Sequence, residues 1–520
     1  MKRIAIVILI FFMFQSLNSF AKNKGTEVFK YGRFEAQFPN MTWSGNPFDV
    51  DLSVVFVSPS GRELTQPGFY AGNNIWKVYF MPDEAGKWQY QTSSSDDDLN
   101  GHKGKFTCVK SIKESVLTTS GKHWALSTGE GYFPVIWGPT VPDGGHWGFR
   151  GKDADDQVVD DALLFANDVV NADLLGIGEL VVVRTGWAKD WPESALPYVP
   201  GKEGEEFNLT FWDELNKKLD MAASMNMGIY VMFYGDDEMT PDRYGITPYS
   251  DSEMRLFRYA IARLACYPHV LWDSGIDIGE YRDNKWINWF AEWFLEHDPW
   301  KHPVSSRSGG GSGGIRPKKA TYFSTGGAEL PSREKLLKIF EESNVPVAHT
   351  DHWRPFISRG NWDSDKIRRA VWRCGLSGPQ ALYVDYNQGK LVQKEIIRGG
   401  QFTGHAMHFF KGSLKNDIRE LIPHDELVKG GGNVILSCKE GEEYVAYDED
   451  GSEFSLHLPE SSSVYIAEWY NPRTGLVISS EEIKGNKDIL FTPPSEGKDW
   501  VLHVYLKRKP VKIKLKMKKK

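Results

Sequence analysis

Acidic side chains stand where several short apolar segments of the sequence end. In chain order these carboxyl groups belong to Asp236, Asp237, Asp277, Glu280, Asp351 and Asp385. Two carboxyl groups on either side of a glycosidic bond can hydrolyse it, because one protonates the leaving oxygen while the other, ionised, attacks the sugar or activates water. The residue types therefore indicate acid–base chemistry on a carbohydrate, provided that the fold brings two of them together.

The best-placed pair is Asp277 and Asp351, which follow the fourth and the seventh of eight apolar segments. In a closed barrel of eight β/α units those two strands lie on opposite sides of the mouth, so their terminal carboxyl groups can flank one bond. A single aspartate at a strand end is more often a helix N-cap or an ion-pair partner. We predict these two as the catalytic residues because both positions agree with one mechanism.

The other polar and aromatic residues at predicted strand ends are expected to bind the substrate. Indole and phenol rings pack on the C–H faces of sugars, and the chain contains 19 Trp residues, although most single rings fill a core. The predicted substrate-binding residues are Trp137, Arg184, Trp187, Tyr234, Asp236, Asp237, Glu280, Arg307, His349, His352, Trp353 and Asp385. His349 and His352 flank Asp351 and could bind a metal, but hydrogen bonding to the substrate is the favoured interpretation.

Other chemistries have little support in the sequence. It has no His-Glu-x-x-His zinc motif, and its four cysteines show no paired spacing. The glycine-rich stretch 309–314 is not followed by Gly-Lys-Ser/Thr, so we interpret it as a loop rather than a phosphate site. We expect no metal and no cofactor, and the net charge of −7 argues against nucleic-acid binding.

The segments that must position these side chains alternate between short apolar strands and longer amphipathic stretches. The eight predicted strands cover residues 133–137, 180–184, 229–234, 270–274, 303–307, 321–324, 346–349 and 382–385. The stretch 252–267 illustrates the helical segments, because apolar residues recur at steps of three and four between Met254 and Leu264. This order predicts an α/β fold, a (β/α)₈ TIM barrel over residues 113–429.

Alternating strands separated by turn residues occupy both sides of this region. They predict one β-sandwich over residues 22–112 and a second over residues 430–506. Residues 507–520 contain nine basic residues and no acidic one. We expect a solvated, disordered tail there, and contact with an anionic polymer is the alternative.

The first residues resemble an export signal. Two basic residues precede the apolar run 4–14, and Ser19-Phe20-Ala21 provides a small-x-small cleavage site. The run is too short to span a membrane, so we expect residues 1–21 to be removed from a secreted, periplasmic or cell-surface protein. The sequence carries no signal for an oligomeric state.

Two segments carry a more specific resemblance. Residues 267–277 (YPHVLWDSGID) resemble the Tyr-Pro-Asn-Val-x-Trp-x-x-Gly-Gly/Asn-Asp/Glu segment of the apiosidase-like glycoside hydrolases, family 140 and its relatives. Residues 345–351 (VPVAHTD) resemble the Lys-Pro-Val-x-x-Gly-Glu segment of the same family. The resemblance implies that Asp277 is the general acid/base and that Asp351 is the nucleophile.

The flanking regions resemble domains that often accompany such barrels. Residues 80–88 (FMPDEAGKW) look like an N-terminal immunoglobulin-like domain of unknown function, and residues 469–475 (WYNPRTG) look like a C-terminal sandwich named for collagen binding. Two positions depart from the family pattern. Ile276 stands where relatives have a polar residue or glycine, and Asp351 is shorter than Glu by about 1.5 Å, which implies a changed mechanism or lost catalysis.

Together these features predict a secreted glycoside hydrolase that cleaves a plant or algal cell-wall polysaccharide. The alternative is a catalytically silent polysaccharide-binding protein on the same scaffold, since the fold does not fix the function. The two differ in whether reducing ends are released from a bound glycan.

Overall fold

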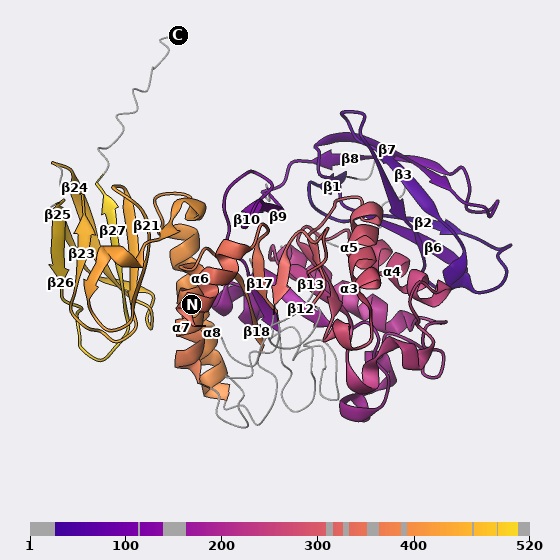
Figure 1. The fold of residues 1–520 in the computed structure, drawn as a ribbon. Helices are drawn as coiled ribbons and strands as arrows, with labels where there is room; N and C mark the ends of the chain where they lie inside the picture. Colours follow the sequence, from indigo (N-terminus) through magenta and orange to yellow (C-terminus); the bar gives the residue numbers. More distant parts are fainter. Residues whose placement is uncertain are drawn as a thin grey trace, which may run out of the picture.

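The computed structural model describes residues 27–112, 115–138, 163–307, 316–325, 332–350, 363–385, 393–459, 462–485 and 487–507. Figure 1 shows an N-terminal pair of sheets, a central barrel surrounded by helices, and a C-terminal pair of sheets beside the last helices. The predicted export signal and most of the basic tail lie outside the described residues.

The central sheet has eight parallel strands in the order β15-β14-β13-β12-β11-β18-β17-β16. Their bounds are β11 Val135–Gly138, β12 Leu174–Gly178, β13 Gly228–Tyr234, β14 Val270–Gly275, β15 Val304–Ser305, β16 Phe323–Thr325, β17 Val347–His349 and β18 Ala381–Asp385. The two edges of the sheet meet where the N–H of Thr321 donates to the carbonyl of Val304 at 2.9 Å. The predicted TIM barrel is confirmed, and the carboxyl ends of its strands share one mouth.

The second strand differs from its predicted position. The second strand of the sheet is Leu174–Gly178, and residues 180–184, where we predicted it, follow as an irregular stretch. Val182 and Val183 instead pack with Trp191 and Met239 in a separate small apolar cluster. Two adjacent apolar runs of similar length carry the same periodicity, so the sequence pattern could not tell which of them enters the sheet.

The helices follow the strands on the outside of the barrel. They are α3 Leu209–Ser224, α4 Asp251–Leu264, α5 Asn284–His297, α6 Arg333–Glu342, α7 Ser364–Gly375 and α8 Gln393–Gly412. Helix α4 overlaps the predicted stretch 252–267 but begins one residue earlier, where the Ser250 side chain accepts a hydrogen bond from the N–H of Glu253. This cap satisfies one of the backbone donors that a helix start leaves without a partner.

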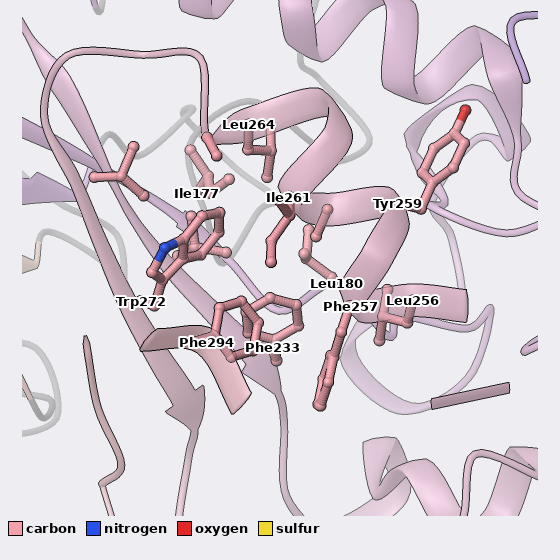
Figure 2. Close-up of a cluster of buried hydrophobic side chains, with 14 of the residues drawn as sticks. Ile177, Leu180, Phe233, Leu256, Phe257, Tyr259, Ile261, Leu264, Trp272 and Phe294 are labelled. Atoms are coloured by element: carbon pink, nitrogen blue, oxygen red, sulfur yellow. The ribbon is translucent and has the colours of Figure 1, made fainter. Parts of the chain in front are cut away.

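Two apolar layers hold the barrel together. Figure 2 shows the outer layer, in which Phe233 and Trp272 of neighbouring strands meet Phe257 of α4 and Phe294 of α5. The ring centroids of Phe233 and Phe294 lie 5.0 Å apart. The inner layer fills the barrel with side chains of a second cluster, so the barrel is a packed core rather than a channel.

A hairpin closes the amino-terminal end of the barrel. Strands β9 (Leu117–Ser120) and β10 (His123–Leu126) pair antiparallel, and Leu117 and Trp124 belong to the inner cluster. The indole N–H of Trp124 donates to the carbonyl of Val347 at 3.0 Å. The hairpin therefore covers the end of the barrel that lies opposite to the carboxyl ends of its strands.

The N-terminal region is a sandwich of two sheets, β1-β8-β7-β3-β4 and β2-β6-β5. Its strands are β1 Glu27–Phe29, β2 Phe34–Pro39, β3 Ser53–Val57, β4 Glu63–Pro67, β5 Phe69–Tyr70, β6 Ile75–Phe80, β7 Gly86–Ser93 and β8 Lys103–Val109. It is attached to α4, because the side-chain amide of Gln66 donates to the carbonyl of Ile261 at 3.2 Å. The buried guanidinium of Arg263 also lies 4.5 Å from the ring centroid of Phe69.

The C-terminal region is a second sandwich, with sheets β19-β21-β22-β27-β24-β25 and β20-β23-β26. Its strands are β19 Ile422–Pro423, β20 Val428–Gly430, β21 Val434–Lys439, β22 Glu443–Asp448, β23 Phe454–Leu458, β24 Val464–Asn471, β25 Leu476–Lys484, β26 Lys487–Phe491 and β27 Trp500–Leu506. Asp499 attaches it to α7, since its carboxylate accepts hydrogen bonds from Arg368 at 2.6 and 2.9 Å. Arg473 and the hydroxyl of Tyr447 also donate to this carboxylate, each at 2.6 Å.

Removing one of these hydrogen bonds should destabilise the folded chain measurably. We expect Tyr447→Phe to lower the free energy of unfolding by about 1.5–3 kcal/mol, because a buried charged acceptor loses a donor. Tyr505→Phe is the matched control, since its hydroxyl donates to Glu468 at 3.1 Å in a partly exposed site and should cost under about 1 kcal/mol. Urea unfolding measures both, and equal losses would contradict the expectation.

Within the described residues, no helix combines the length and the apolar character that a bilayer crossing requires.

Candidate active site

The end of β14 places Asp277 at the mouth of the barrel. Gly275 has φ +130°, and a side chain there would collide with the backbone of Tyr234, so only glycine fits this position. The next residue returns to the sheet, because the N–H of Ile276 donates to the carbonyl of Tyr234 at 2.8 Å. Asp277 then takes a left-handed conformation with φ 44° and ψ 38°. Strained residues of this kind cluster at functional sites, which makes this turn a candidate.

Ile276 occupies a place inside the barrel. Its side chain is buried in the inner cluster with Tyr230 and Met232. An apolar residue fits there because its neighbours are apolar, which accounts for one departure from the family pattern.

Four carboxyl groups, those of Asp236, Asp237, Asp277 and Glu280, follow the ends of β13 and β14. Glu280 is exposed, and slight desolvation together with the negative charges of Asp277, Asp236 and Asp237 raises the pKa of its carboxyl group. Asp237, like Asp277, has a left-handed backbone, with φ 49°. The structure therefore brings together four of the residues that the sequence predicted for the site.

Beneath this group lies a buried carboxylate that the sequence reasoning overlooked. Asp273 has no exposed surface, and its Oδ1 accepts hydrogen bonds from the backbone N–H of Gly275 at 3.2 Å and of Arg307 at 3.1 Å. The hydroxyl of Tyr230 donates to Oδ2 at 3.1 Å. Burial raises the pKa of Asp273, and the charge of Arg307 opposes that shift. The signal was an aspartate inside the apolar run 270–275, where a charge needs a partner.

Arg307 joins the two segments that carry the predicted catalytic residues. Its carbonyl accepts a hydrogen bond from the N–H of Ile278 at 3.3 Å, directly after Asp277. Its Nη1 donates to the carbonyl of Thr350 at 2.6 Å, at the end of the described part of this segment. The side chain is 2% exposed, so this residue lies within the barrel rather than on the surface of its mouth.

Three predicted substrate-binding residues face the helix layer. The ring of Trp137 lies 5.4 Å from that of Phe165, and the hydroxyl of Tyr234 donates to Glu253 at 3.0 Å. The Nε2 of His349 lies 2.8 Å from the side-chain oxygen of Gln380. The structure does not bring these three side chains into the group of carboxylates.

Burial of His349 gives the protein a pH-dependent stability. Desolvation lowers the pKa of His349 from its ordinary 6.5 to about 4. The unfolded chain takes up this proton below pH 6.5 while the folded chain does not, so stability is complete above pH 6.5 and is lost as the pH falls toward 4. We expect His349→Gln to remove about 2–3 kcal/mol of the decrease in unfolding free energy between pH 7.5 and 4.5.

Urea unfolding at the two pH values measures this effect, and His102→Gln is the control because His102 is exposed. A variant at position 349 with the same pH dependence as the unmodified chain would contradict the expectation.

The remaining predicted residues are only partly placed. Arg184 is exposed on the irregular stretch after β12. Asp385 ends β18 and Trp187 lies in a short 3₁₀ helix, but their side chains are outside the described part of the structure. Asp351, His352 and Trp353 lie outside the described residues altogether. The pairing of Asp277 with Asp351 therefore stays a prediction.

Among the described residues, no group of three or more His, Cys, Asp or Glu side chains is arranged to hold a metal ion. The four cysteines are buried and form no disulfide.

Two family models match the flanking regions. Residues 27–95 match a domain of unknown function, and residues 422–505 match the "putative collagen-binding domain of a collagenase". A search of the curated proteins found no match.

Solved structures resemble the chain over most of its length. A "putative glycoside hydrolase" from Bacteroides vulgatus is 18% identical with a TM-score of 0.72, over 92% of this chain and 99% of that one. A glycoside hydrolase family 5 structure from the same organism is 15% identical with a TM-score of 0.57, over 75% and 93%. A third structure, named a glycoside hydrolase, is 13% identical with a TM-score of 0.56, over 75% and 96%.

None of these three names the apiosidase-like family, so that resemblance stays a prediction. At such identities the likeness establishes the architecture: the chain has the eight-stranded barrel and flanking sheets that are found in structures named as glycoside hydrolases.

Proposed function

We propose that the chain is a secreted glycoside hydrolase that cleaves a plant or algal cell-wall polysaccharide. Asp277 acts as general acid/base, and Asp351 acts as nucleophile or base. The observation that carries the proposal is the group of carboxyl side chains at the ends of β13 and β14, at the face where barrel enzymes bind their substrates. The likeness to structures named as glycoside hydrolases supports it, although a shared fold does not by itself fix a reaction.

The position of Asp277 supports a role in proton transfer. A general acid or base must lie within hydrogen-bonding reach of the reacting group, and Asp277 follows β14 at the carboxyl end of the barrel, where barrel enzymes bind their substrates. The hydrogen bonds of Arg307 to the segments that precede Asp351 and follow Asp277 support their placement at one mouth.

The test is release of oligosaccharides from a panel of pectic, hemicellulosic and sulfated algal polysaccharides. The full mature chain should release reducing ends from at least one of them, and analysis of the products should identify the linkage. If the chain binds a polysaccharide saturably but releases no reducing ends after long incubation, it is a binding protein on a hydrolase scaffold.

A further inference from the structure

A cavity of about 340 Å³ lies between the N-terminal sandwich and the outer face of α4, and it is lined by residues 47–52 and 67–70 of the sandwich. The barrel contributes Arg255, Arg258 and Tyr259 of α4. None of the carboxyl residues at the mouth of the barrel lines this cavity. Its volume falls within the range of sites that bind small molecules.

The aromatic side of the cavity is held in place before any ligand arrives. The ring of Tyr70 lies 4.8 Å from Trp76, 5.4 Å from Phe48 and 6.1 Å from Trp43. The hydroxyl of Tyr259 donates to the carbonyl of Tyr70 at 3.2 Å, which fixes the backbone of this wall to the barrel. Tyr70 and Phe48 are only partly buried, so the cavity has rigid rings within reach of solvent.

Four charged residues line the cavity, and two of them form an ion pair. These are Asp49 and Arg255, with Nε and Nη2 of the arginine donating to the two carboxylate oxygens at 2.6 and 2.7 Å. Arg258 and Asp51 are both exposed, and neither side chain makes a hydrogen bond or ion pair with any residue that the structure describes. A guanidinium donor and a carboxylate acceptor are therefore left for a ligand.

We infer that this cavity binds a neutral sugar ring of the polysaccharide. The choice of a glycan as the ligand rests on the proposed function. The cavity and its unpaired polar groups are features of the structure that do not depend on that proposal. A sugar ring packs its C–H face on an aromatic side chain, here Tyr70 or Phe48, and presents hydroxyl groups that both donate and accept. Arg258 supplies the matching donor and Asp51 the matching acceptor, and their opposite charges favour a neutral ligand over an ionised one.

The site holds the polymer at a second point, away from the carboxylates that cleave it. A chain anchored at two points leaves the protein more slowly than one held only at the mouth. Residues 27–95 of the N-terminal sandwich match a family described only as a domain of unknown function. This site gives the sandwich a role in substrate binding.

Affinity electrophoresis of the full chain through gels containing one polysaccharide each tests the inference. The probes are xylan, galactomannan and arabinan as neutral polymers and polygalacturonate as a charged one. The variants carry Asp277→Asn as well, so that the polymer in the gel is not hydrolysed during the run. We expect retardation by a neutral polymer, and Arg258→Ala in this background should raise the dissociation constant about tenfold or more, because a charged hydrogen-bond donor is lost. Asp51→Asn should weaken binding in the same gel.

The matched control is Arg369→Ala, which removes an exposed arginine from α7 at a place that does not line this cavity. The inference is overturned if Arg258→Ala and Arg369→Ala migrate alike, if no neutral polymer retards the chain, or if polygalacturonate alone does so. Thermal unfolding midpoints within the range of the control show that the variants are folded. If binding depends on Arg258 but the unmodified chain releases no reducing ends, this site is supported and the hydrolase proposal is refuted. If the unmodified chain releases reducing ends but Arg258→Ala binds the polymer as tightly as the control does, the hydrolase proposal is supported and this site is refuted.

Discussion

Asp277→Asn should lower kcat on a hydrolysed polysaccharide by roughly 10²–10⁴-fold, the usual contribution of a positioned general acid or base. Asparagine keeps the shape of the side chain but cannot give up or accept the proton, so binding of the substrate should change much less than turnover. The left-handed backbone at this position tolerates asparagine, which makes a folding defect a poor explanation for the loss. Initial rates of reducing-end release, at several substrate concentrations, separate kcat from KM.

Asp97→Asn serves as the control for this prediction, because it makes the same chemical change on an exposed residue of the N-terminal sandwich. Full turnover by Asp277→Asn would remove this residue from the mechanism. Asp351→Asn, assayed in parallel, tests the second carboxyl group in the same way.

Arg307→Met should lower the free energy of unfolding by about 3–5 kcal/mol, because it leaves the buried carboxylate of Asp273 without its positive neighbour. It also removes the hydrogen bond from Nη1 to the carbonyl of Thr350. The two effects act together, so activity should fall even at temperatures where the variant is folded. Urea unfolding measures the first effect, and kcat at low temperature measures the second.

A double-mutant cycle with Asp273→Asn distinguishes the charge effect from a loss of packing. If the charge of Asp273 causes the instability, Arg307→Met should cost less in the Asp273→Asn background than in the unmodified chain. Equal costs in both backgrounds would show that the two side chains do not stabilise each other.

Much of the architecture could be predicted from the sequence because its signals are periodic. The alternation of apolar strands with amphipathic helices predicted the barrel, and turn residues between short strands predicted the two flanking sandwiches. The exception was the second strand, where 174–178 and 180–184 are both apolar and only packing decides between them. Composition alone therefore cannot predict which of the two runs enters the sheet.

The site was harder to predict than the fold. Position at a strand end predicted that Asp236, Asp237, Asp277 and Glu280 share one face, because parallel strands end there, and the three aspartates do act electrostatically on Glu280. It could not show which way a side chain points near such an end. Tyr234 faces α4 rather than the mouth, and Asp273 is buried, where its carboxylate accepts a hydrogen bond from the backbone N–H of Arg307.

The attachment of the C-terminal sandwich restricts how this chain can be shortened or recombined. Trp372 of α7 and Phe410 of α8 share one apolar cluster with Tyr447 and Val501 of the sandwich. A linker-joined module can be cut away or exchanged without harm to its neighbour, but here the cut would pass through a common core. Shortened versions that end near residue 420 would expose the apolar faces of α7 and α8, so any redesign of this scaffold should keep the last sandwich with the barrel.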